Sequence, residues 1–212
     1  MRQILVDSCM VISVACVVLV LSGCISVQKS PAPRFYLLSA VNENKVSKKI
    51  NIASDVFIGV GPVKIPEYLD RPQMVTQSKE KMITFAQFDR WGESLDLGVA
   101  RLIREYLTVM LPDAKFSLYP WNSSVPVKYQ VVVEIVELDS EFDEGMFFAA
   151  QWLVIDTENS KTLIMKRAEF RQPIIPQDYS GLAKTLSAVC ASLSSQISEE
   201  LATLDAHPKT NE

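Results

Sequence analysis

Two segments of the chain repeat apolar residues at helical spacing. The first spans residues 95–110 and is stopped by Pro112, because the residue before a proline avoids the helical region. The second spans residues 179–204, and Asp178 stands where an N-cap is expected. Each segment gathers its apolar side chains on one face, as an amphipathic helix does when it packs on a core. These residues are Leu95, Val99, Leu102, Ile103, Tyr106, Leu107 and Met110 in the first, and Leu182, Leu186, Val189, Leu193, Ile197, Leu201 and Leu204 in the second.

Shorter runs rich in β-branched and aromatic residues predict strands. Three long ones, at residues 128–138, 146–155 and 162–170, are joined by short polar connections and predict an antiparallel run. Further short strands are expected at residues 34–38, 56–60, 73–76, 82–85 and 116–119. Pro62 and Pro66 each remove a backbone donor, so the strand that runs into them is expected at a sheet edge or in a bend.

The order of strands, helix, strands and helix predicts an α+β fold, a two-layer sandwich. In this arrangement two amphipathic helices cover one face of a mainly antiparallel sheet. Residues 24–212 are long enough to form one domain with its own core. The second face and the edges of the sheet would remain open to partners or to self-association.

The amino-terminal segment has the pattern of a bacterial lipoprotein signal. An apolar run follows Arg2 from residue 9 to residue 21, and it is shorter than the ~20 residues that span a bilayer. Asp7 weakens the positive charge before this run. Leu-Ser-Gly-Cys at residues 21–24 resembles a lipobox, with small residues at the cut and Cys24 as the thiol that takes the lipid.

This reading divides the chain into four parts. We expect a signal peptide at residues 1–23, a lipidated tether at 24–33, one domain at 34–205 and a flexible tail at 206–212. Two or more acyl chains on Cys24 would attach the protein stably to a membrane. Position 25 is isoleucine and not the aspartate that retains lipoproteins at the inner membrane. In this respect the chain resembles lipoproteins that are sorted to the outer membrane. An uncleaved membrane anchor, or an ordinary secretory signal cut elsewhere, remains an alternative.

The composition argues against several classes of function. A net charge of −4 without a basic run makes nucleic acid a poor partner. With Cys9 and Cys16 in the signal and Cys24 lipidated, Cys190 is left alone, so no disulfide framework is expected. The only histidine is His207, in the tail, and the sequence has no CxxC pair, phosphate-binding glycine loop or nucleophile elbow. We therefore expect no enzyme activity and no cofactor beyond the covalent lipid.

Carboxylates are dense near the end of the first long strand and the connection that follows it. They could form a cation site, but their spacing does not match a calcium loop. The simpler interpretation is a solvated hairpin end. The residues are Glu134, Glu137, Asp139, Glu141, Asp143 and Glu144.

Two stretches combine residue types that are enriched in binding hot spots. The first, at residues 65–72, is stiffened by prolines and contains Tyr68, Leu69, Asp70 and Arg71. It predicts either a structural bend or a docking loop. The second contains Arg90 and Trp91, just before the first helix. It predicts either packing of the tryptophan at the sheet–helix junction or a recognition patch. These six residues are the candidate partner-binding residues.

The same two stretches resemble a known family. A lipobox is followed by FYLL at residues 35–38, EYLDRPQMV at 67–75 and RWGESL at 90–95, as in the PqiC/YmbA lipoproteins, the ABC-type transport auxiliary lipoproteins. Gly92 stands where many relatives have alanine. The resemblance covers nearly the whole chain after the lipobox. It implies an outer-membrane lipoprotein that faces the periplasm, an accessory subunit of an MCE-domain system that carries lipids between membranes and supports membrane integrity.

The main hypothesis is therefore a docking subunit that meets an MCE-domain protein and could associate with copies of itself. Two other functions remain open. A lipid-binding carrier would enclose an apolar groove, and a regulatory lipoprotein would bind an envelope enzyme such as a peptidoglycan synthase. The sequence does not indicate the transported lipid, the oligomeric state, the face that meets the partner, or whether ATP drives the system.

Overall fold

The computed structural model describes residues 30–40, 49–53, 55–78 and 80–206. The chain divides into two compact units, Met1–Ala32 and Pro33–Glu212, and every helix and strand described below lies in the second. The expected signal peptide, Cys24, most of the tether and the tail from residue 207 lie outside the described residues. None of the helices in the described part of the chain combines the length and the apolar character needed to cross a membrane.

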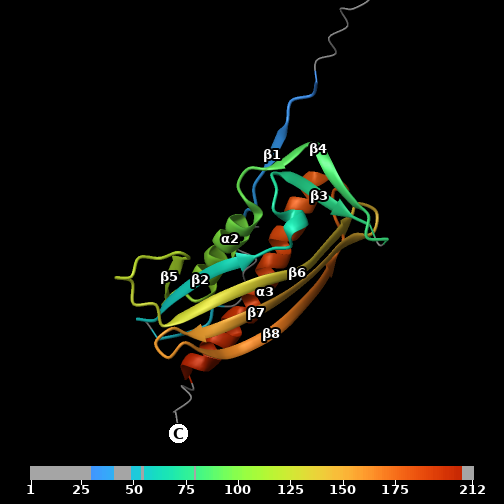
Figure 1. Ribbon diagram of the computed structural model, residues 1–212. Helices are drawn as coiled ribbons and strands as arrows, with labels where there is room; N and C mark the ends of the chain where they lie inside the picture. The colour runs from blue at the N-terminus through green and yellow to red at the C-terminus, as the bar shows by residue number, and fades with distance from the viewer. Residues whose placement is uncertain (1–29, 41–48, 54, 79, 207–212) are drawn as a thin grey trace, which may run out of the picture. The chain divides into compact units, whose positions relative to one another are not determined.

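Eight strands form one mixed, mostly antiparallel sheet (Figure 1). Its centre is β6, which pairs along one edge with β7, and β7 pairs with β8, both antiparallel. The other edge of β6 is shared by β2, which is parallel to it, and by β3. β5 extends the sheet beyond β2, whereas β4 and then β1 extend it beyond β3. The strands are β1 Arg34–Tyr36, β2 Phe57–Lys64, β3 Gln73–Gln77, β4 Ile83–Trp91, β5 Lys115–Leu118, β6 Tyr129–Glu141, β7 Gly145–Asp156 and β8 Lys161–Gln172.

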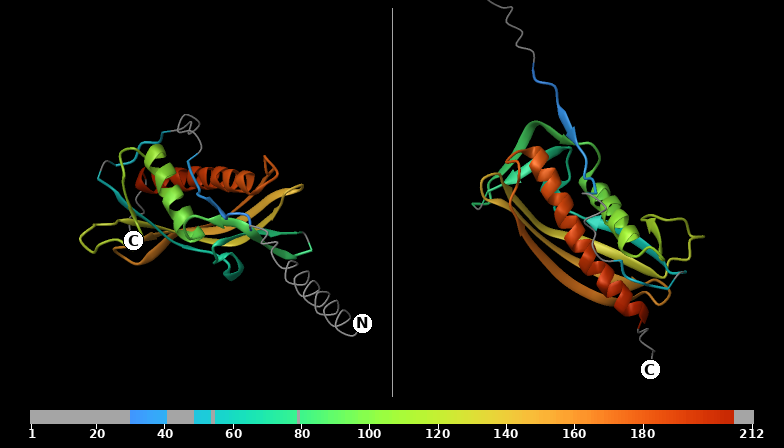
Figure 2. Two further views of the ribbon diagram at one scale, coloured as in Figure 1. Left: turned by 90° about the horizontal axis from the view of Figure 1, so that it is seen from above. Right: turned by 180° about the vertical axis from the view of Figure 1, so that it is seen from behind.

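Two long helices, α2 (Leu95–Met110) and α3 (Tyr179–Ala206), lie on the same side of the sheet (Figure 2). The short helix η3 (Glu67–Leu69) projects on the opposite side. This confirms the predicted α+β class, with two helices packed against each other and against a mostly antiparallel sheet. Both helices also coincide closely with the segments that the apolar spacing predicts.

The alternation along β6 explains how the sheet meets the helices. Tyr129, Val131, Val133 and Ile135 are buried, whereas the residues between them are less so. The register with β7 shifts between Ile135 and Glu137, after which Leu138 and Ser140 are the buried positions. A bulge of this kind keeps the apolar side chains of a long, twisted strand on the face that the helices cover.

Helix α3 places several serines in the core without leaving their hydroxyl groups unpaired. Ser187 and Ser194 each donate to the carbonyl four residues earlier, at 2.8 Å. The helix begins as predicted, because the Asp178 carboxylate accepts the backbone N–H of Gly181 at 2.8 Å. This hydrogen bond lowers the pKa of Asp178. Gly181 is required there, since a Cβ would lie 1.7 Å from the carbonyl oxygen of Pro176.

Of the two positions expected for the strand with the prolines, the sheet edge is wrong, and an irregularity in the pairing occurs instead. β2 continues through Pro62 to Lys64 and lies between β5 and β6. The missing donor of Pro62 falls where the register with β6 shifts, between Val60 and Val63, so it leaves no gap in the ladder. Gln130 Nε2 donates to the carbonyl of Gly61 at 2.8 Å in the same place. β4 is also longer than expected and ends at Trp91.

An aromatic side chain covers β2 on the helix-free face of the sheet. Gly59 lies between Ile58 and Val60, which face the core, so a side chain at Gly59 would point to the other face. A Cβ there would lie 2.4 Å from Cζ3 of Trp121. The Trp121 ring also meets Tyr119 edge to face, with centroids 5.6 Å apart. The indole of Trp121 therefore packs directly against the backbone of Gly59.

We expect Gly59→Ala to destabilise the domain by about 1–3 kcal/mol, because the methyl group overlaps the indole. In a Trp121→Ala background the same change should cost much less. Urea unfolding of the four proteins of this double-mutant cycle measures the coupling. Strictly additive effects would show that the indole does not rest on Gly59.

Candidate partner-binding surface

Strand β1 is fixed to the sheet by one buried carboxylate. β1 pairs in parallel with the end of β4, where Arg34 lies opposite Asp89. Asp89 is only 4% exposed, yet both of its oxygens are satisfied. Arg34 donates from Nε and Nη2 at 2.8 Å, and the Tyr36 hydroxyl donates at 2.8 Å. A buried charge is tolerated only with such partners, so β1 and Asp89 stabilise each other.

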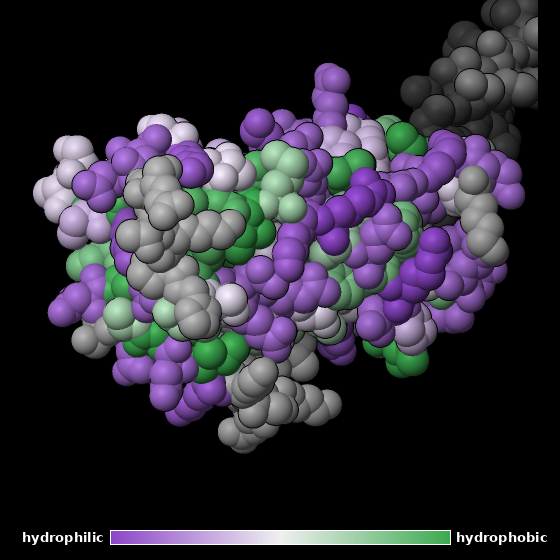
Figure 3. Space-filling model, turned by 90° about the horizontal axis from the view of Figure 1, so that it is seen from below, coloured by the Kyte–Doolittle hydropathy of each residue, from purple (hydrophilic) through white to green (hydrophobic). Residues whose placement is uncertain are grey.

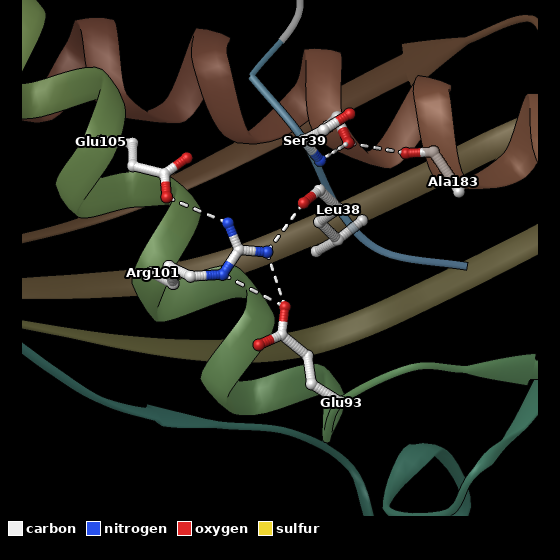
Figure 4. Close-up of polar contacts among 7 residues, drawn as sticks. Leu38, Ser39, Glu93, Arg101, Glu105 and Ala183 are labelled. Atoms are coloured by element: carbon white, nitrogen blue, oxygen red, sulfur yellow. Dashed lines mark hydrogen bonds and ion pairs between the residues drawn. The ribbon is translucent and has the colours of Figure 1, made fainter. Parts of the chain in front are cut away.

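The chain that leaves β1 is held next by helix α2 (Figure 4). Arg101 donates from Nη2 to the Leu38 carbonyl at 2.7 Å and to Glu93 at 2.6 Å. Its Nη1 donates to Glu105, one helical turn away, at 3.0 Å. The hydrogen bond with Glu93 raises the pKa of the Arg101 guanidinium. Arg101 thus joins the loop before α2, the helix itself and the segment that follows β1.

Helix α3 holds the same segment from its other side. The backbone N–H of Ser39 donates to Ser187 Oγ at 3.3 Å, and the Ser187 hydroxyl donates in turn to the Ala183 carbonyl (Figure 4). Residues 34–39 therefore contact a strand and both helices. We call this set of contacts, centred on Asp89, Arg101 and Ser187, the β1 junction.

Trp91 is buried beside the β1 junction and is not part of the exposed surface. It is 7% exposed, and its backbone N–H donates to the Pro72 carbonyl at 2.7 Å. The next residue, Gly92, donates to the Tyr36 carbonyl at 2.8 Å. A Cβ at Gly92 would lie 3.0 Å from Cδ2 of Leu37, which is an exposed and movable atom. An alanine would fit after a small shift of Leu37.

The predicted docking loop packs against the sheet through Leu69, which is buried. Tyr68 is half-buried, and its hydroxyl lies 3.5 Å from the carbonyl oxygen and 3.4 Å from the backbone nitrogen of Leu138. Burial raises the pKa of Tyr68. Asp70 follows η3 and is exposed. This short segment is therefore ordered by the strands beneath it.

Arg71 lies flat on an aromatic ring. Its guanidinium carbon is 4.0 Å from the centroid of Phe85, a half-exposed residue of β4. This is the geometry of a cation–π contact. Nε of Arg71 is buried and has no hydrogen-bond partner within the described residues. The ring contact thus fixes the orientation of a side chain whose charge remains available.

The acidic stretch of β6 holds a cation that the protein itself supplies. The Lys81 ammonium makes ion pairs with Glu137 and with Asp139, the latter at 2.6 Å. Hydrogen bonding to Lys81 lowers the pKa of Glu137, and hydrogen bonding to Asp139 and Glu137 raises the pKa of Lys81. No group of metal-ligating side chains occurs among the residues that the structure describes. The geometry thus favours the hairpin-end interpretation of this acidic stretch.

A cavity of about 670 Å³ opens beside this ion-pair cluster. Its lining includes Lys81, Glu137, Asp139 and Arg171, together with Phe147. The Arg171 guanidinium carbon lies 4.2 Å from the centroid of the Phe147 ring. Charged side chains of both signs line this hollow, which makes it unlike the apolar groove that a lipid chain would need.

The structure brings the two predicted stretches together. Gln73 pairs with Arg90, directly beside the hydrogen bond between Pro72 and Trp91. Leu69 and Trp91 form the buried base, so they offer little side-chain surface to a partner. The residues that keep accessible surface are Tyr68, Asp70, Arg71 and Arg90. The sequence did not identify Phe85, nor Asp89 and Lys81, whose partners are more than fifty residues away in the chain.

A family model matches most of the described chain. It is the model of the ABC-type transport auxiliary lipoprotein component, and it covers residues 36–198. The chain belongs to this family. The match includes both stretches on which the resemblance rests and the whole of α2 and most of α3. The family name agrees with the expected non-enzymatic role. A comparison with curated proteins found no match.

Solved structures share the fold of this auxiliary lipoprotein at low sequence identity. The crystal structure of an uncharacterized protein superposes with a TM-score of 0.64 at 17% identity, covering 81% of this chain and 99% of its own. Protein XCC0632 from Xanthomonas campestris gives a TM-score of 0.61 at 6% identity, covering 83% and 97%. A PelC dodecamer from Paraburkholderia phytofirmans gives only 0.44 at 12% identity, covering 74% and 93%. The first two establish a shared fold.

Asp89→Asn should loosen β1 by removing the charge that Arg34 and Tyr36 bind. We expect a loss of about 1–3 kcal/mol in the free energy of unfolding, because a buried, charge-assisted pair is broken. Amide hydrogen exchange at residues 34–39 should also become faster. Asp55→Asn is the matched control, since Asp55 also pairs with a basic residue but its side chain is 90% exposed. Equal effects of both changes would argue against the β1 junction.

The Lys81 ion pairs predict a pH-dependent contribution to stability. Because the folded state lowers the pKa of Glu137, this contribution is present above the ordinary value of about 4.5 and is lost as the pH falls through the lowered pKa. Lys81→Met should therefore reduce the melting temperature slightly at pH 7, and the difference from the unchanged protein should shrink below pH 4.5. Lys64→Met is the control, because Lys64 is exposed and makes no ion pair within the described part of the chain.

Proposed function

We propose that the chain is an outer-membrane lipoprotein of the periplasm that docks an MCE-type intermembrane lipid transport system and so supports membrane integrity. The observation that carries the proposal is the match of the transport auxiliary lipoprotein family to residues 36–198. The lipobox ending at Cys24 and the isoleucine at position 25 support attachment to the outer membrane. The MCE partner rests on the resemblance of residues 67–75 and 90–95 to PqiC-type lipoproteins.

The domain would act by binding, without catalysis. A lipid on Cys24 would hold it at the membrane, and the MCE assembly would meet the docking surface formed by Tyr68, Asp70, Arg71 and Arg90. These side chains stand on a buried base, and Arg71 is oriented by the ring of Phe85. A preorganised surface loses little conformational entropy on binding, which favours specific recognition over a small area.

We propose in addition that copies of the chain associate, as a collar around a transport tunnel would require. The outermost strands β1, β5 and β8 each pair with only one other strand in the described sheet, so they present free backbone edges. Such edges pair readily with another chain unless something covers them. Light scattering on the purified lipoprotein in detergent tests this part, and a monomer at high concentration would contradict it.

The lipid-carrier alternative finds less support in the geometry. A carrier needs an enclosed apolar space, and the cavity of about 670 Å³ is lined by charged residues of both signs. It would predict phospholipid that remains bound to the domain through purification. The regulatory alternative predicts instead the recovery of peptidoglycan enzymes as partners.

Affinity purification of the lipidated chain from gently solubilised envelopes tests the proposed function. We expect an MCE-domain protein among the partners identified by mass spectrometry. The double variant Asp70→Arg, Arg90→Glu should reduce its recovery by about tenfold or more, since reversing the charges at the centre of an interface typically costs several kcal/mol.

Asp113→Arg is the control for this experiment, because Asp113 is also exposed but lies after the far end of α2. It should leave recovery unchanged. Cys24→Ala should release the protein from the outer-membrane fraction. Recovery of peptidoglycan enzymes alone would favour the regulatory function, and recovery of lipid without a protein partner would favour the carrier.

A further inference from the structure

Strand β1 exposes apolar side chains at an edge of the sheet. Arg34 and Tyr36 both bind Asp89, although the Arg34 side chain itself stays 67% exposed. The positions between and after them are apolar, with Phe35 65% exposed and Leu37 58% exposed. An edge strand normally turns its apolar residues inward and its charges outward.

A third apolar side chain lies close to this strand in the fold. Leu97, in the first turn of α2, is 56% exposed, although its neighbours Leu95 and Val99 are buried. Gly92, five residues before it, meets both the Tyr36 carbonyl and the Leu37 side chain, which brings the start of α2 beside β1. We call Phe35, Leu37 and Leu97 the tether-end apolar group.

The chain that precedes β1 limits what this group meets. Phe35 is eleven residues after Cys24. An extended chain spans at most ~3.3–3.6 Å per residue, so a lipid on Cys24 would confine Phe35 to within ~40 Å of the membrane surface. At such a high effective concentration, even a weak apolar contact with the bilayer is occupied much of the time. Phe35 lies opposite Arg90 in the pairing of β1 with β4, so this group borders the docking surface and would meet the membrane at its margin.

We propose that the tether-end apolar group rests on the phospholipid surface and sets the orientation of the domain on the membrane. The proposal rests on the lipid attachment at Cys24 that is part of the proposed function. It adds that the domain has a defined orientation on the membrane. Exposed apolar side chains enter the boundary between headgroups and acyl chains when they are held close to it. Figure 3 shows the molecule from below, the end away from β1, where hydrophilic side chains separate the apolar patches.

The test uses the full, lipidated protein in vesicles of phosphatidylethanolamine and phosphatidylglycerol. A single cysteine at Phe35→Cys or Leu97→Cys carries an environment-sensitive fluorophore, and spin-labelled phospholipid serves as the quencher. Met165→Cys is the matched control, because Met165 is 60% exposed but lies on β8. The native Cys190 is fully buried and does not compete for the label.

We expect the labels at positions 35 and 97 to be quenched several-fold more strongly than the label at 165. Position 97 is decisive, because it is far from the tether in sequence and reports orientation. If the vesicles float with the protein bound but all three labels are quenched equally, the membrane contact of the tether-end apolar group is wrong. The lipid attachment at Cys24 would still be supported. If the protein does not float with the vesicles, both the lipid attachment and the membrane contact are wrong. Concentration-dependent energy transfer between labels at position 35, without quenching by lipid, would assign the group to a contact between copies and overturn the membrane contact.

Discussion

The structure depends on β6, the one strand that all parts of the sheet share. Its edge toward β7 is paired along its whole length, and its other edge is divided between β2 and β3. The two halves of the domain, β2 with β5 and β3 with β4 and β1, are therefore joined chiefly through this strand. Its bulge between Ile135 and Glu137 allows one continuous strand to keep its apolar side chains on the buried face. Both the docking surface and the β1 junction take their positions from this arrangement.

The sequence predicts the periodic elements well, because burial on one face leaves a pattern within each segment. The stripes of α2 and α3, the three long strands and the N-cap at Asp178 all follow from residues close together in the chain. The interior position of β2 could not be predicted in the same way. Pro62 indicates an edge locally, and only the distant strand β6 shows that the missing donor falls at a register shift.

The candidate site illustrates the same limit. The sequence indicates Tyr68, Arg71, Arg90 and Trp91 as two separate stretches, and it shows neither that they meet nor which of them are buried. Trp91 is buried, and its backbone N–H donates to Pro72, which directly precedes β3, the strand that pairs with β4. The acidic stretch of β6 suggests a cation site, and its cation is Lys81, which is more than fifty residues away. Pairings of this kind are set by topology, and no spacing in the sequence records them.

The pairing of β1 with β4 has a mechanical consequence for the chain that precedes it. A pull on the chain before Arg34, directed along the strand, loads the contacts of β1 in shear, because β1 must slide past β4 before the two strands part. The salt bridge at Asp89 bears such a load first, and Arg101 and Ser187 hold the chain behind it. Bonds loaded together in shear resist far more force than bonds that are unzipped one at a time. The amino-terminal end of the domain is thus built to stay folded when the chain before it is pulled along the strand.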